Sequence, residues 1–104
     1  METNKFRLWE MTLDPNQSSE LHTHSKEYSI YVQNGSIVEV YDVDDKLVGV
    51  LDAKTGTQID FLLDKKKKKF VSKQNSSIAI PLTHKAKNVG KSRFRELLIE
   101  FKPN

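Results

Sequence analysis

The amino-acid sequence predicts an all-β protein built from many short strands. Apolar and polar residues alternate with a period of two through most of the chain, and no stretch repeats every three to four residues as a helix would. Turn-forming residues separate these runs at spacings of about ten residues or less. Many short strands at such spacings are typical of a sandwich or barrel. Because 104 residues suffice for one core, we expect a single domain over residues 1–104.

Each predicted strand is bounded by a turn signal. Asp14-Pro15-Asn16-Gln17 places proline at the second position of a turn. Asn34-Gly35 indicates a tight hairpin, because the primed turns that such pairs favour need positive φ at both central residues. The predicted strands are residues 6–13, about 19–24, 27–33, 36–43, 46–51, 58–63, 70–72, 78–80, 84–89 and 93–101, with 36–43 returning as the hairpin partner of 27–33.

The histidines form the pattern that carries most chemical information. His22 and His24 are two residues apart, so an extended strand presents both imidazoles on one face. The third histidine, His84, lies in another strand-like run far away in sequence. If the fold brings these two runs together, every histidine of the chain sits at one point, where it could bind a metal ion.

Two segments around the histidines match spaced motifs. The first has Asn16, five residues, His22-Thr23-His24, three residues, Tyr28, six residues and Gly35. The second has Asn75, five residues, Pro81, then His84, and Asn88 four positions after it. Together they resemble the two motifs of the cupin superfamily, a likeness that extends from about Leu13 to Phe101. The stretch from proline to histidine is two residues shorter than in the family, and asparagine stands where each motif opens with glycine.

The resemblance implies a small single-domain cupin, with a double-stranded β-helix or jelly-roll barrel of two antiparallel sheets. It also implies a divalent metal held by His22, His24 and His84. Tyr28 occupies the place of the family's glutamate and would point inward, either as a core aromatic or as a catalytic group in the pocket. The adjacent Glu27 would point outward. Asparagine tolerates the left-handed region better than other non-glycine residues, which supports turns at Asn16 and Asn75.

The ligand set leaves the metal unassigned. Three neutral imidazoles leave a divalent ion with its full charge, so the site should favour anionic ligands and keep open coordination positions. This arrangement resembles the three-histidine iron site of cupin thiol dioxygenases. Imidazole ligands also suit zinc, nickel, copper and manganese.

Two functions fit these features. The first is an enzyme acting on a small anionic metabolite as a dioxygenase, isomerase or lyase, with Tyr28 as proton donor or orienting group. The second is a non-catalytic module that binds or senses a small molecule in the same pocket. A metal-free cupin fold is a further alternative. Asn88 is expected to make a structural hydrogen bond, and Arg93, Arg95 and Glu96 to be surface charges unless one reaches the pocket.

The composition and charge of the chain limit its expected location and binding partners. There is no cysteine, no apolar run long enough for a transmembrane helix and no secretory signal, which favours a cytoplasmic protein without membrane contact. The net charge is +3, with a lysine run over 65–69 that we expect to be a solvated hairpin tip rather than a nucleic-acid site. The resemblance implies a homodimer, and Phe6, Trp9 and Met11 are candidates for the interface. For Trp9 and Met11, packing inside the barrel is the alternative.

Overall fold

A computed structural model describes residues 1–102, which form ten β-strands and contain no helix. The strands are β1 (Phe6–Leu13), β2 (His22–Thr23), β3 (Tyr28–Asn34), β4 (Ser36–Tyr41), β5 (Leu47–Ala53), β6 (Gln58–Asp64), β7 (Lys69–Ser72), β8 (Ala79–Pro81), β9 (Thr83–Asn88) and β10 (Phe94–Phe101). The predicted strands therefore all exist, most of them within one or two residues of the predicted bounds. No helix of the described part of the chain is long and apolar enough to cross a membrane.

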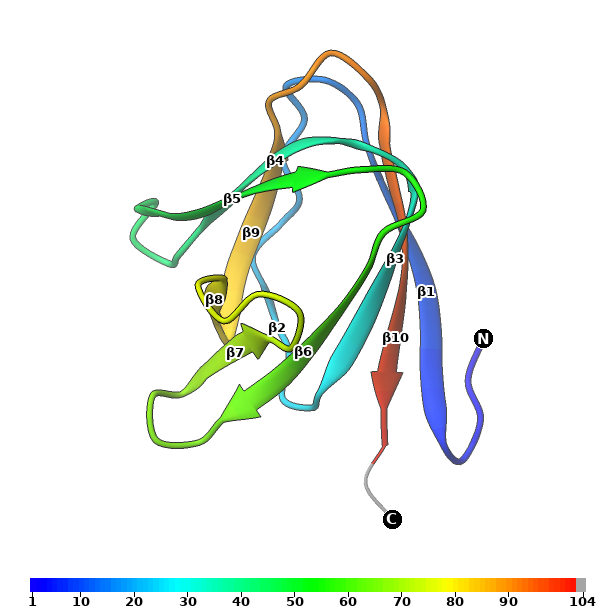
Figure 1. Cartoon of the computed structure of the whole chain (residues 1–104), viewed down its shortest axis with the longest axis vertical. Helices are drawn as coiled ribbons and strands as arrows, with labels where there is room; N and C mark the ends of the chain where they lie inside the picture. Colours follow the sequence, from blue (N-terminus) through cyan, green and yellow to red (C-terminus); the bar gives the residue numbers. More distant parts are fainter. Residues whose placement is uncertain (103–104) are drawn as a thin grey trace.

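The strands form two antiparallel sheets that face each other as the walls of a barrel (Figure 1). One sheet has the order β1-β10-β3-β6-β7-β8, and the other has the order β2-β9-β4-β5. Consecutive strands repeatedly change sheets, as in a jelly roll. The all-β, jelly-roll prediction is confirmed.

The core follows from the alternation of side chains along each strand. In β3, Tyr28, Ile30 and Val32 are buried and face the interior, as the period-two pattern predicts. Two apolar clusters fill the barrel. The first is formed by Tyr28, Ile30, Val40, Ile59, Phe61, Phe70, Ile80 and Leu98, and the second by Leu13, Val32, Val38, Ala53, Ala86 and Phe94.

The predicted hairpin at Asn34-Gly35 is wrong. Strand β3 pairs with β10 and β6, while β4 pairs with β5 and β9, so the chain crosses from one sheet to the other at Gly35. Neither residue has positive φ. Glycine is needed for a different reason, because a Cβ there would lie 2.2 Å from the Ala53 carbonyl oxygen and 2.7 Å from the Thr55 nitrogen.

The other turn predictions have mixed outcomes. Asn16 has a φ of 69°, in the left-handed region as expected. Asn75 does not; its side chain instead accepts hydrogen bonds from the backbone nitrogen and hydroxyl of Ser77. Residues 65–68 form the exposed turn between β6 and β7, so the lysine run is the solvated hairpin tip that was predicted.

The first strand turns two of the proposed interface residues inward. Trp9 and Met11 pack against the two core clusters, opposite Leu98 and Glu96 on β10. They are therefore barrel residues, which is one of the two alternatives that the sequence left open for them, and the dimer interface stays a prediction. Phe6 has the opposite parity and lies on the outer face of the sheet.

Candidate metal centre

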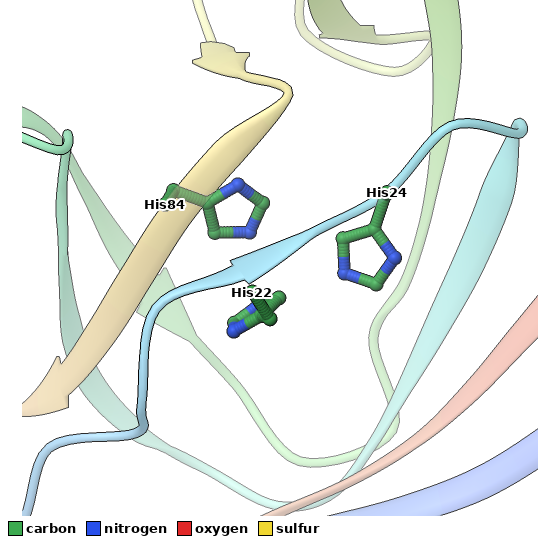
Figure 2. Close-up of side chains that lie close together, drawn as sticks. All are labelled: His22, His24 and His84. Carbon is green, nitrogen blue, oxygen red and sulfur yellow. The ribbon is translucent and has the colours of Figure 1, made fainter.

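Strand pairing brings the three histidines together. In the short β2–β9 ladder, His22 is directly opposite His84, and His24 follows one residue after β2 ends. The backbone nitrogen of His24 donates to the Leu82 carbonyl at 3.0 Å, which holds this part of the chain beside β9. Figure 2 shows the three imidazoles gathered between these segments. Their potential ligand nitrogens all lie within 4.8 Å of one another.

Backbone carbonyls orient two of the three rings. The Nδ1 of His22 lies 2.9 Å from the Glu20 carbonyl oxygen, and the Nδ1 of His84 lies 2.8 Å from that of Pro81. A carbonyl only accepts hydrogen bonds, so each Nδ1 carries the proton and each Nε2 keeps its lone pair. The Pro81 carbonyl is three residues before His84, in the stretch that is shorter than in the family motif.

His24 shows that the site fits a metal. Its ring is 4% exposed, yet neither ring nitrogen has a hydrogen-bond partner within residues 1–102. An unpaired buried polar atom costs about 1–3 kcal/mol. A metal ligated by three imidazoles would bind one ring nitrogen of His24 through its lone pair. Three imidazoles are a donor set suited to catalytic zinc, iron or nickel sites.

Burial keeps two of the imidazoles neutral. Desolvation, reinforced by the positive charge His22 can carry, lowers the pKa of His24 to about 4. Desolvation likewise lowers the pKa of His84 to about 4, although its hydrogen bond to Pro81 opposes the shift. Both rings are therefore in the ligand-competent form at neutral pH without competition from protons.

Tyr28 lies where the sequence predicts, against the histidines. Its ring stacks on His24 with centroids 4.3 Å apart and an interplanar angle of 25°. Burial, and then the charge of Glu96, raise the pKa of Tyr28 well above its ordinary value, so its hydroxyl stays protonated. Glu27 points away, as expected, and its carboxylate accepts a hydrogen bond from the Leu63 nitrogen at 2.8 Å.

Two glutamates of β10 also enter the barrel. Glu96 and Glu100 are 6% and 8% exposed, and share a strand face with the buried Phe94 and Leu98. Glu100 was missed from the sequence, and Glu96 was considered chiefly as a surface charge. Period two groups both with buried residues, but the other parity of this strand carries three apolar residues, Leu97, Ile99 and Phe101, against two, so the pattern alone favours the wrong face.

Glu96 is the charged residue near the last strand that reaches the cavity. Desolvation raises its pKa to about 8. Arg93 and Arg95 are exposed and pair with Asp14 and Glu10, respectively. They are surface charges, as the sequence indicated.

Asn88 is structural, as expected. It is fully buried, and its side-chain amide donates to the Leu13 and Ser92 carbonyls while its oxygen accepts from Ser36 and Gly90. All of its hydrogen-bonding capacity is therefore used in joining strand ends.

The histidines separate two spaces. An interior cavity of about 50 Å³ is lined by the three histidines, Tyr28 and Glu96 together with apolar core residues. On its other side a hollow of about 590 Å³ opens to the surface over His22, His24 and Glu96, with Arg7, Trp9 and Lys26 on its walls. A third hollow, of about 540 Å³, lies along β5 and β8 and contains no histidine. The surface hollow is the larger of the two spaces that the histidines line.

Comparison with solved structures agrees with this architecture. A cupin domain from Bordetella pertussis Tohama I superposes with a TM-score of 0.70 and 14% identity, over 99% of this chain and 88% of the other. The chain has the cupin fold. No family model and no curated protein matches the sequence.

Two other cupin-fold neighbours have named activities. The polyketide cyclase RemF from Streptomyces resistomycificus has a TM-score of 0.54 and 22% identity, over 95% of this chain and 56% of RemF. A protein described as a sugar phosphate isomerase of the cupin superfamily, from Silicibacter pomeroyi, has a TM-score of 0.54 and 12% identity, over 96% and 52%. This chain thus spans little more than half of either protein, and the likeness concerns the cupin fold.

Proposed function

We propose that this cupin-fold chain binds a divalent metal ion through His22, His24 and His84 and uses it in proton-transfer chemistry on a small oxygenated metabolite. The observation that carries the proposal is the convergence of three imidazoles, those of His24 and His84 buried and that of His22 half-buried. The rings of His22 and His84 have their Nε2 lone pairs left free by backbone hydrogen bonds. A bound divalent ion supplies Lewis acidity toward an oxygen atom of the substrate. Its identity among iron, zinc, nickel and manganese stays open.

Glu96 is the residue best suited to carry the proton. It is buried beside the histidines, and a pKa of about 8 lets its carboxyl hold a proton at neutral pH and release it within the range of a general acid or base. Tyr28, with its raised pKa, keeps its hydroxyl protonated, and it serves as an orienting group for the ring of His24, on which it stacks. The acid–base role thus moves from Tyr28 to Glu96.

The surroundings support a small, strongly polar substrate. Arg7 and Lys26 flank the hollow that opens over His22 and His24, and Trp9 offers an apolar wall. Four glutamates, Glu10, Glu20, Glu96 and Glu100, also line it, so a preference for an anion would come from the metal charge rather than from the walls. Cyclisation of a polyketide and isomerisation of a sugar phosphate, the activities in the names of two structural neighbours, both involve oxygenated substrates. These likenesses support an isomerase, lyase or cyclase more than a dioxygenase.

A non-catalytic binding module is the second candidate. The interior cavity is only about 50 Å³, which is close to the space taken by one or two waters, so a metabolite cannot sit beneath the histidines beside Tyr28. A ligand held wholly in the surface hollow would be bound without contact with that buried phenol. The homodimer and the cytoplasmic location stay predictions.

The first experiment is elemental analysis of protein purified without a polyhistidine tag or chelator. We expect close to one divalent ion per chain, lost in the His22→Ala/His24→Ala variant while its circular dichroism stays that of a β protein. Ser25→Ala, an exposed change next to His24, is the control and should keep the ion. A double variant that retained its metal would contradict the ligand assignment.

The metal then directs the activity assay. With zinc, nickel or manganese, we expect deuterium uptake from D₂O into small keto acids or sugars, detected by NMR and abolished by Glu96→Gln. Iron would call for oxygen-consumption assays with thiol acids. If Glu96→Gln left turnover unchanged, Glu96 would not be the proton carrier; a protein that bound such compounds without turnover would be the binding module.

A further inference from the structure

The three histidines differ in what faces Nδ1. For His22 and His84 it is a backbone carbonyl at hydrogen-bond distance. For His24 it is a side chain: the Oε2 of Glu100 lies 3.6 Å from Nδ1, slightly beyond a hydrogen bond. Both side chains are buried, at 4% and 8% exposure, so little water competes for this contact.

The register of the large sheet explains why Glu100 is there. In the β10–β3 ladder, Glu100 is directly opposite Tyr28, and paired residues of neighbouring strands project from the same face of the sheet. That face is the barrel interior, since Tyr28 is a core residue. Tyr28 occupies the position where the sequence motif would have glutamate. The carboxylate missing from β3 is thus present one strand away, on β10.

We propose that Glu100 is a positioning residue for His24. Its carboxylate accepts the Nδ1 proton of His24, which turns the Nε2 lone pair toward the metal, as the Glu20 and Pro81 carbonyls do for the other two rings. It also provides negative charge that the phenol of Tyr28 does not. This inference rests on the proposed metal binding, and a small movement of the Glu100 side chain would close the contact.

The other glutamates near the site do not fit this role. The Glu27 carboxylate is engaged by the Leu63 nitrogen outside the barrel. Glu96 is on the same face of β10, but it is opposite Val32, which lies four residues along β3 from Tyr28. Within the described residues, Glu100 is the carboxylate recorded within 4 Å of a histidine ring nitrogen.

The tautomer of His24 tests the orienting contact directly. Long-range ¹H–¹⁵N NMR at pH 7 on chelator-treated protein should show His24 protonated on Nδ1, and in Glu100→Ala a substantial population protonated on Nε2. Glu10→Ala is the matched control, because it removes an exposed carboxylate, paired with Arg95, from the same sheet. It should leave the His24 signals unchanged.

Metal affinity tests the consequence. Titration with Co²⁺, followed by its visible absorption, should show affinity lowered about 10–100-fold in Glu100→Ala, the range typical for loss of a carboxylate that orients a metal-bound histidine. Glu100→Gln keeps the side-chain volume, so it still tests the contact if Glu100→Ala fails to fold. Its amide oxygen can still accept the proton, but without charge, so we expect a smaller loss, of about tenfold or less.

The outcomes separate the inference from the proposed function. Loss of the Nδ1 tautomer together with weaker Co²⁺ binding supports both. Wild-type protein that binds Co²⁺, with unchanged tautomer and affinity in the two Glu100 variants, overturns the role of Glu100 and leaves metal binding intact. Wild-type protein that binds no Co²⁺ overturns the proposed function and, with it, the role of Glu100 toward a metal.

Discussion

Tyr28 shows how one residue serves the core and the site together. One side of its ring stacks on His24, and Phe61 and Phe70 contact it with centroids 5.0 Å away. It is therefore a core aromatic that lies against His24, one of the proposed metal ligands. The sequence left open whether Tyr28 was a packing or a pocket residue, and the geometry shows that the same ring is both.

The packing and polar roles of Tyr28 are separable by substitution. We expect Tyr28→Phe to keep the free energy of unfolding within about 1 kcal/mol and to retain metal, because the ring contacts survive. Tyr28→Ala should lower the free energy of unfolding by about 3–5 kcal/mol, as for other buried aromatics. It should also leave the His24 ring without the aromatic ring that stacks on it. Urea unfolding and metal titration measure the two effects. A Tyr28→Phe variant that lost its metal would assign the hydroxyl a direct role.

At the scale of elements, the crossing from β3 to β4 decides the architecture. A hairpin at Asn34-Gly35 would have put both strands in one sheet, whereas the crossing sends β3 and β4 to opposite walls. The tight approach is held by the Thr55 hydroxyl, which accepts from the Gly35 nitrogen at 2.8 Å, and by Ser92, whose hydroxyl donates to the Gly35 carbonyl at 2.6 Å. These partners come from segments far away in sequence.

Gly35→Ala tests this crossing. The added Cβ would lie 2.2 Å from the Ala53 carbonyl oxygen, so backbone must move, and we expect a loss of about 1–3 kcal/mol in the free energy of unfolding. Gly49→Ala is the control, because nothing lies within 4 Å of its Cβ and its φ is not positive. It should be neutral or stabilising by less than about 1 kcal/mol. Equal effects in chemical denaturation would contradict the steric explanation.

At the scale of the whole molecule, buried titratable groups shape the dependence of stability on pH. His24 and His84 have folded-state pKa values of about 4, below the ordinary 6.5, so the unfolded chain binds more protons between these values and stability falls as pH falls. Glu96 has a folded-state pKa of about 8, above 4.5, so its contribution is full at low pH and is lost as pH rises to 8.

The opposing signs predict a stability maximum near pH 6.5 for the chelator-treated protein. Below this pH the two histidines change the free energy of unfolding more than Glu96 does. Above it Glu96 alone changes the free energy of unfolding, by up to about 1.4 kcal/mol per pH unit. Urea unfolding between pH 4.5 and 8.5 measures the curve. Glu96→Gln should remove the decline between pH 6.5 and 8 and steepen the rise below pH 6.5, because the two histidines then act without opposition. A decline that persisted in this variant would show that other groups cause it.

Local chemistry explains what was predictable. Alternation predicted all ten strands because each buries one face, and the His-x-His spacing placed His22 and His24 together because strand geometry has a period of two. The lysine turn followed from charge, and the outward direction of Glu27 from the inward direction of Tyr28. Each of these features depends on residues close together in the chain.

What only the tertiary structure decided involves pairing between distant segments. The sequence by itself determined the fold class, the strands and three candidate ligands. The structure decided that β3 and β4 lie in different sheets, that Trp9 and Met11 face the core, and that Glu96 and Glu100 stand beside the histidines. In β10 the outer face carries more apolar residues than the inner one, so the neighbours supplied by β1 and β3, rather than any local pattern, set which side chains enter the barrel.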